Sequence, residues 1–301
     1  MKGASRVLLM ARGLDHIVHA VRDLDAAADF YRRAGFTVSA RNVHPWGTHN
    51  HVVQFPGFFI EVLTVGEPGK LHEKPHAEGL ARVFGIANRD FIARGEGFSM
   101  LALESRDIDA DAEDFQRHGI GMSQALPFTR DAKLPDGSTV TVGFTLAFAR
   151  DAMSPGTSFF AIQHRDPAMF YKKELQQHAN GASGVLGAVL VADNPADHHI
   201  FLGAVTGVRD LHSSSIGVTA PTPRGDVEIM EAVSFRDQFG TVPNLDGEGA
   251  ALKGLRLNVP DLAATERALA SGGIVSHRHV GRLVVPPEAA FGATLIFEKQ
   301  P

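Results

Sequence analysis

The chain has 301 residues, a formal net charge of −5 and no cysteine. The lack of cysteine excludes disulfide scaffolds, thiolate metal sites and cysteine nucleophiles, and the acidic balance argues against a nucleic-acid footprint. No apolar run approaches the roughly 20 residues that span a bilayer, and the first residues carry no signal-peptide pattern. We therefore expect a cytoplasmic protein without nucleic-acid or membrane partners, with a homodimer left open.

A strand–helix unit occurs at least twice in the chain. The segment RDLDAAADFYRRAGFTVS at residues 22–39 reappears 84 positions later as RDIDADAEDFQRHGIGMS, and each copy follows an apolar, strand-like run. Two weaker copies begin at GVLGAVLVAD and LKGLRLNVPD in the second half. Repeats of this length indicate one supersecondary unit used several times. At 301 residues, four such units fit two domains of two units each.

Local signals define the elements of the first unit. LDHIVHAV is expected to be a strand, Asp23 or Asp25 can cap the helix that follows, and Gly35 can end it. THNHVVQF and FFIEVLTV are then predicted to be strands, because Pro56 and Gly57 separate them. In the second unit, PDGS at residues 135–138 predicts a hairpin turn.

Two polar residues interrupt the apolar strands of the first unit. Glu61 shares a strand face with Phe59 and Leu63, and His16 shares one with Val18. A carboxylate on a buried face costs several kcal/mol unless it is paired, hydrogen-bonded or bound to a cation. If the two strands share a sheet, an imidazole and a carboxylate converge, which is a common start for a Zn, Mn, Ni or Fe(II) site. The alternative is an arginine partner for the carboxylate and a core histidine.

The second unit is not a chemical copy of the first. At the 84-residue offset His16 aligns with Met100, whereas the terminal strand SFFAIQH carries Gln163 and His164 near the position equivalent to Glu61. His164 as a third ligand would complete two histidines and one carboxylate, leaving coordination positions open for water or substrate. The alternative is a strand-end histidine that faces solvent.

Other histidines are candidates for a substrate pocket. His49 and His51 lie two residues apart and face the same way on a strand, so they could line a pocket or be exposed. Trp46 follows a proline and suggests an apolar wall, and His178 lies in the turn between the halves. His198 and His199 fall on a predicted helix, where a solvated or boundary position is expected.

These repeats and motifs resemble the vicinal oxygen chelate superfamily, and within it the glyoxalase-like domain family, over roughly residues 12–205. The resemblance implies an α+β fold of four βαβββ modules, forming one domain over residues 12–175 and a second, degenerate one over 180–301. In the superfamily the first-strand histidine and last-strand glutamate bind the metal, which here are His16 and Glu61. Leu186 and Gly254 stand at the histidine positions of the second half, so no metal is expected there, although Glu228 or Glu231 and Glu298 keep the carboxylates.

The sequence thus predicts a metal-dependent enzyme that chelates two neighbouring oxygens of a small substrate. The predicted metal ligands are His16, Glu61 and His164, and the predicted catalytic residues are Glu61 and His51. The expected chemistry is that of an isomerase or lyase, or of a ring-cleaving dioxygenase. The alternative is a metal-free protein that binds an aromatic or drug-like molecule. The predicted pocket residues are His49, His51, Trp46, Gln163 and His178.

Overall fold

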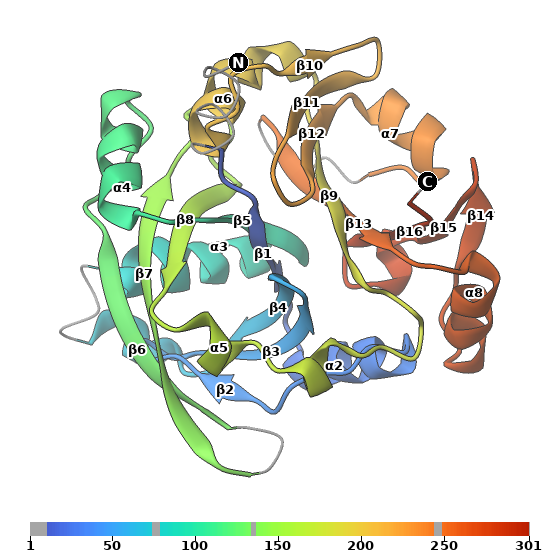
Figure 1. Cartoon of the computed structure of the whole chain (residues 1–301), viewed down its shortest axis with the longest axis horizontal. Coiled ribbons are helices and arrows are strands. Elements are labelled where there is room, and N and C mark those ends of the chain that lie inside the picture. Colours follow the sequence, from blue (N-terminus) through green and yellow to red (C-terminus); the bar gives the residue numbers. More distant parts are fainter. Residues whose placement is uncertain (1–10, 74–78, 134–136, 244–248, 301) are drawn as a thin grey trace.

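The computed structural model describes residues 11–73, 79–133, 137–243 and 249–300. Two eight-stranded sheets, one from each half of the chain, are flanked by helices. In Figure 1 the sheet of the N-terminal half, in blue and green, lies to the left of the sheet of the C-terminal half, in yellow to red. No helix in the described ranges is long and apolar enough to cross a membrane.

The N-terminal half contains two βαβββ modules. The elements of the first, with the helical segment that follows it, are β1 (Leu14–Ala20), α2 (Leu24–Arg33), β2 (Asn42–Val43), β3 (Thr48–Phe55), β4 (Phe58–Val65), η1 (Pro68–His72), η2 (Ala81–Ile86) and α3 (Ala87–Arg94). Those of the second, with the segment that leads to the other half, are β5 (Gly97–Glu104), α4 (Ile108–Arg117), β6 (Leu126–Lys133), β7 (Thr139–Ala149), β8 (Ser158–His164), α5 (Pro167–Phe170) and η3 (Lys173–Gln176).

The C-terminal half repeats this order with shorter strands. Its third module contains β9 (Gly184–Val191), η4 (Pro195–His198), α6 (His199–Thr206), β10 (His212–Ser213), β11 (Gly217–Pro221), β12 (Asp226–Met230) and α7 (Ala232–Phe239). Its fourth contains β13 (Ala251–Asn258), α8 (Leu262–Ser271), β14 (His277–His279), β15 (Arg282–Val285), η5 (Pro287–Ala289) and β16 (Thr294–Glu298).

Strand pairing confirms the predicted modular α+β fold. The first sheet has the order β2-β3-β4-β1-β5-β8-β7-β6, and the second the equivalent order β10-β11-β12-β9-β13-β16-β15-β14. Within each module the first and last strands are parallel, as β1 and β4 are, and the two modules of a half meet at an antiparallel pair such as β1 and β5. The predicted PDGS turn lies partly outside the described residues, but the strands it joins, β6 and β7, pair antiparallel.

The repeated aspartate explains why the helices start where they do. Asp23 accepts a hydrogen bond from the Ala26 amide at 2.9 Å, and Asp107 accepts the equivalent bond at the start of α4. Asp261 caps α8 in the same way. An aspartate at this position satisfies a helix N–H that would otherwise lack a partner. Gly35 follows α2 with φ +83°, a conformation that favours glycine, so the predicted stop is confirmed.

Two apolar clusters lie on opposite faces of the first sheet. The larger one includes Leu14 and Ile17 of the first half together with Ala188 and Leu255 of the second, so it runs without a break between the halves. The other, around Phe59, covers the opposite face. The division into domains at residues 175 and 180 stays a prediction, since the two halves share a core.

Candidate active site

Glu61 lines a small cavity on the face of the first sheet away from α2. Its side chain is 4% exposed and shares the strand face with Phe59 and Leu63, as the alternation predicted. The cavity has a volume of about 30 Å³. Its polar lining residues are His16, His44, Asn50, Glu61 and Arg130, and the apolar ones are Trp46, Phe59, Phe84, Phe128, Phe144, Leu146, Phe160, Ile162 and Phe170.

His16 presents its Nε2 atom to Glu61. Its Nδ1 atom lies 2.7 Å from a carboxylate oxygen of Asp15, and its Nε2 atom lies 3.8 Å from Oε2 of Glu61. The ring stacks on Phe59 with centroids 4.2 Å apart. Because an ionised carboxylate only accepts hydrogen bonds, Nδ1 carries the proton. In the neutral ring, Nε2 therefore offers a lone pair to the cavity.

His44 faces the other oxygen of the same carboxylate. Its Nε2 atom lies 3.7 Å from Oε1 of Glu61, and its Nδ1 atom lies 2.8 Å from the hydroxyl of Thr48. Burial, with a smaller contribution from the Arg130 charge, holds the pKa of His44 well below its ordinary value, so the ring is neutral. The buried Thr48 hydroxyl has no other partner among the described residues, so it donates to Nδ1. The proton of His44 is then on Nε2, the tautomer opposite to that of neutral His16.

Neighbouring groups partly offset the cost of burying the Glu61 carboxylate. Burial raises the pKa of Glu61, and the charge of His16, a hydrogen bond from the Asn50 amide and the charge of Arg130 each oppose the rise. Burial lowers the pKa of Arg130 to about 10, against the attraction of Glu61, so Arg130 is a cation at neutral pH. Its Nε atom is buried and has no hydrogen-bond partner among the described residues. The cavity thus combines a carboxylate of raised pKa, a neutral imidazole N–H and a guanidinium.

His164 contacts Asp15 rather than Glu61. Its Nε2 atom lies 3.0 Å from the second oxygen of Asp15, so Asp15 joins His164 to His16. The Nδ1 atom of His164 and the hydroxyl of Tyr171, whose ring stacks on it, are buried without partners among the described residues. His164 does not line the cavity.

The predicted metal ligands are therefore not gathered around one point. Across the described ranges, no group of three or more histidine, aspartate or glutamate side chains is placed to hold a metal ion. His16 and His44 approach different oxygens of Glu61, and the positive Arg130 lines the same cavity. The residues as arranged do not fit a divalent metal.

The register of the sheet corrects one equivalence assumed from the sequence. Glu61 lies opposite Val18, and in the second module Ala102, the counterpart of Val18, lies opposite Phe160. Phe160 therefore occupies the position equivalent to Glu61, whereas Gln163 and His164 lie farther along β8. The polar end of β8 lies three to four residues beyond the equivalent position, so alignment by polar residues alone places the equivalence too far along the strand. The Gln163 amide instead bonds the Ile108 N–H at 3.3 Å and the Arg106 carbonyl at 3.2 Å, at the start of α4.

The His-x-His pair shares a strand face as predicted, but that face is directed away from the cavity. On β3, Asn50 and Val52 face the cavity, whereas His49 and His51 alternate with them. His51 Nδ1 lies 2.8 Å from the Ser39 carbonyl oxygen, and His49 bonds Glu67 at 3.1 Å. The structure thus keeps both histidines apart from Glu61.

Of the remaining predicted pocket residues, Trp46 lines the cavity and His178 does not. Trp46 is 1% exposed and stacks on His44 with centroids 4.7 Å apart. His178 bonds the Gln54 carbonyl at 2.9 Å, next to Phe55. The expectation of a solvated or boundary position is wrong for His198, which is 3% exposed because its Nδ1 atom bonds Asp151 at 2.6 Å.

The C-terminal half keeps a counterpart of the carboxylate. Glu228 lies opposite Val189 on parallel strands, as Glu61 lies opposite Val18, so Glu228 occupies the place of Glu61. The same register gives Gly187, and not Leu186, the place of His16. The predicted position was one residue out because β9 (GVLGAVLV) carries no polar residue to fix the alignment.

The guanidinium of Arg256 pairs with two carboxylates of this half. Arg256 donates to Glu228 and to Glu298, the latter at 2.6 Å from Nε, and all three side chains are mostly buried. Burial raises the pKa of Glu228, and the charge of Arg256 opposes the rise. The arginine partner considered as an alternative for Glu61 is thus found at the equivalent carboxylate of the other half.

Replacing Asp15 with asparagine should destabilise the protein by about 1–3 kcal/mol at pH 7, the usual cost of disturbing a buried hydrogen-bonded group. Burial raises the pKa of Asp15, but His164 and His16 together lower it well below its ordinary value. The stabilisation from the ionised Asp15 is therefore present above a pH of about 4 and lost as the pH falls through the folded-state pKa. Denaturant unfolding at pH 7 and pH 3 measures both effects. Asp90→Asn, at an exposed ion pair, is the control; equal effects of the two variants would contradict the assigned bridge.

Comparisons with known proteins address the fold. A model of the family described as "Glyoxalase-like domain" matches residues 14–206. A search of curated proteins finds no match. A solved structure of a hypothetical protein from Staphylococcus aureus is 14% identical with a TM-score of 0.66, covering 97% of this chain and 100% of its own. A mutant of 4-hydroxymandelate synthase from Streptomyces coelicolor is 12% identical with a TM-score of 0.58, covering 97% and 94%. At these identities the two solved structures inform the fold alone.

Proposed function

Because the chain belongs to the glyoxalase-like domain family of the vicinal oxygen chelate superfamily, we propose that it is an enzyme acting on a small carbonyl compound. The proposed reaction moves a proton at the carbon beside the carbonyl group, as an isomerase or lyase does. One observation carries the proposal: the Glu61 carboxylate lies between the Nε2 atoms of two imidazoles, His16 and His44, whose Nδ1 atoms bond Asp15 and Thr48.

Each group has a role in this chemistry. A carboxylate whose pKa is raised by burial is a suitable general base, so Glu61 takes the proton as the C–H bond breaks. The electron pair moves onto the carbonyl oxygen, where the Nε2–H of neutral His44 and the Arg130 cation stabilise the negative charge. The lone pair of His16 can accept a proton from Glu61, and Asp15 stabilises the imidazolium that results. Return of the proton to carbon or oxygen completes an isomerisation.

The size of the cavity favours a small reacting group. A volume of about 30 Å³ accommodates about two water molecules, whereas pockets for drug-sized ligands measure roughly 300–1,000 Å³. Binding and sequestration of a drug-like molecule beside Glu61, the alternative from the sequence, would require the aromatic walls to move apart. A few-atom carbonyl group needs far less displacement.

A metal-assisted reaction is the competing hypothesis. Imidazole and carboxylate are donors that Zn²⁺ and Fe(II) use, and His16, His44 and Glu61 supply both types. However, their placement around opposite oxygens of Glu61 and the charge of Arg130 favour an anionic oxygen over a cation in the cavity. We therefore assign the electrophilic role to His44 and Arg130.

Hydrogen–deuterium exchange tests the proposal without knowledge of the natural substrate. The purified protein in D₂O should catalyse loss of the α-proton NMR signal from at least one member of a panel of hydroxyacetone, pyruvate, glyceraldehyde and lactaldehyde. The rate should be unchanged after treatment with a chelator, because no step uses a metal. Absence of exchange across the panel, or exchange that depends on added Zn²⁺, Mn²⁺, Ni²⁺ or Fe²⁺, would contradict the proposal.

A further inference from the structure

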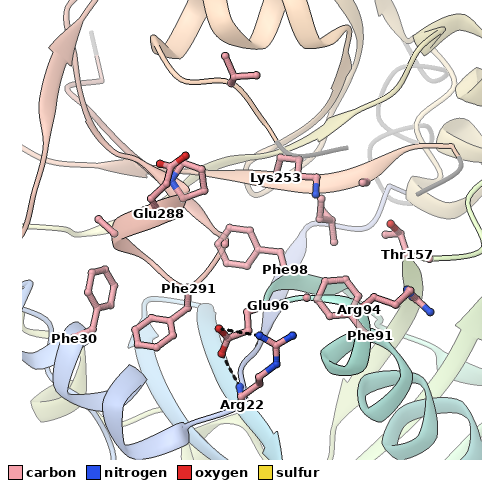
Figure 2. A pocket seen from close by; sticks show the side chains of 18 of the residues that line it. Arg22, Phe30, Phe91, Arg94, Glu96, Phe98, Thr157, Lys253, Glu288 and Phe291 are labelled. Atoms are coloured by element: carbon pink, nitrogen blue, oxygen red, sulfur yellow. Dashed lines mark hydrogen bonds and ion pairs between the residues drawn. The ribbon is translucent and has the colours of Figure 1, made fainter. Parts of the chain in front are cut away.

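A second and much larger cavity lies between the two halves of the chain. This groove has a volume of about 960 Å³, within the range of small-molecule sites. Figure 2 shows aromatic side chains in it, with Arg94 and Glu288 well apart. Its charged and aromatic lining residues are Arg22, Phe30, Arg33, Phe91, Arg94, Glu96, Phe98, Lys253, Glu288 and Phe291.

The backbone on one side of the groove is held in a strained conformation. Phe291 has φ +50°, which is rare for a bulky residue and costs on the order of 1–3 kcal/mol. Its carbonyl accepts a hydrogen bond at 3.0 Å from Nε2 of His19, whose other nitrogen bonds the Tyr31 hydroxyl at 2.8 Å. Burial lowers the pKa of His19 to about 4, against the bond to Phe291, so this contact persists at neutral pH.

The neighbouring residue, Gly292, brings the loop close to the first half of the chain. Gly292 has φ +79°, and a Cβ atom there would lie 2.0 Å from the Glu96 carbonyl oxygen. The Phe291 segment of the second half is therefore pressed against the start of β5 in the first. Strained backbone that the surroundings enforce is concentrated at ligand sites. A groove wall held in place by such contacts has a lower ordering cost when it binds a ligand.

Some of the arginine side chains that line the groove have ion-pair partners and one does not, within the described residues. Arg22 pairs with Glu96, and Arg33 pairs with Asp29. Within the described parts of the chain, Arg94 makes no ion pair or hydrogen bond. In Figure 2 Arg94 lies beside Phe91, whereas Glu288 lies on the opposite side of the view. An anion is therefore favoured near Arg94.

We infer that this groove binds a small aromatic anion, with its ring against Phe91 and Phe291 and its carboxylate on Arg94. A guanidinium binds a carboxylate through two parallel hydrogen bonds, and the partly exposed rings supply an apolar surface. This site is separate from the cavity of Glu61, with which it shares no lining residue. The inference does not depend on the proposed reaction.

Calorimetric titration with 2-naphthoate and its neutral analogue 2-naphthamide tests the site. Arg94→Gln should weaken naphthoate about tenfold or more, the effect of losing a charged hydrogen bond, and leave naphthamide unchanged. Phe291→Asn removes the ring but tolerates a positive φ, so it should weaken both compounds alike. Arg89→Gln, on the same helix but outside the groove, should change neither.

Three results would overturn the inference. These are no binding of naphthoate, equal affinities for the acid and the amide, or affinities that neither groove variant alters. Glu61→Gln should leave naphthoate binding unchanged; a loss of binding in that variant would place the ligand in the other cavity and likewise overturn the inference. Failure of the exchange reaction has no bearing on these titrations, so the two proposals fail separately.

Discussion

Replacing Glu61 with glutamine should lower the rate of α-proton exchange by about 10²–10⁴-fold, the typical contribution of a general base. Glutamine keeps the size of the side chain and can still accept the Asn50 hydrogen bond, but it cannot take a proton. Exchange rates of the two proteins in D₂O, measured by proton NMR with the same substrate, give the ratio. Glu67→Gln is the control: Glu67 is partly exposed, lies outside the cavity and should leave exchange at the wild-type rate.

The same variant should be at least as stable as the wild type at pH 7. Burial raises the pKa of Glu61 above its unfolded value, so ionisation of this group disfavours the folded state. The associated stability is present below a pH of about 4.3 and is lost as the pH rises through the folded-state pKa. Glutamine has no such loss. A melting temperature well below that of the wild type, or exchange at the wild-type rate, would contradict the assigned role.

Replacing Arg256 with methionine should destabilise the protein by about 3–5 kcal/mol at pH 7, the usual cost of leaving buried charges without their partner. Glu228 and Glu298 would then face each other with only Arg282 near Glu298. Denaturant unfolding measures the change. Arg278→Met is the matched control, because its ion pair with Glu266 is about half exposed and should contribute about 0–1 kcal/mol.

The pH dependence of this variant distinguishes lost charge pairing from lost packing. Burial already raises the pKa of Glu228, and Arg256 opposes that rise. Without Arg256 the carboxyl is protonated more readily, so the destabilisation should shrink as the pH falls from 7 to 5. A destabilisation that is the same at both pH values would indicate packing alone and would contradict the charge argument.

The sequence was most informative where one residue broke a local pattern. Glu61 and His16 could be identified because burying an ionisable side chain on an apolar strand is costly unless the side chain is paired or bound. The structure places both residues in the lining of one cavity. Asp23 or Asp25 predicted the start of the first helix, since a capping aspartate acts on the amides next to it, and Asp23 is the residue that caps α2. Such signals depend only on neighbours in the chain.

Other parts of the site depend on contacts between distant segments. His44 lies in a short segment before β3, and Arg130 is on β6, which is at the far edge of the sheet. Phe128 and Arg130, two residues apart, both line the cavity, so alternation on β6 was the available signal for Arg130. The role of His164 could not be foreseen, because it follows from Asp15, whose carboxylate bonds histidines 1 and 149 residues away. Alternation alone does not reveal which buried polar groups meet.

The apolar cluster shared by the two halves determines how a destabilising substitution in one half affects the stability of the other. When two sheets bury the same residues, neither can lose its structure without exposing the apolar surface of the other. The chain should then unfold in one cooperative step. A destabilising substitution at Arg256 would therefore raise the population of unfolded chains, in which the Glu61 cavity is not formed. This would happen although Arg256 does not contact Glu61. The stability of the half without the candidate site therefore contributes to keeping the half with that site folded.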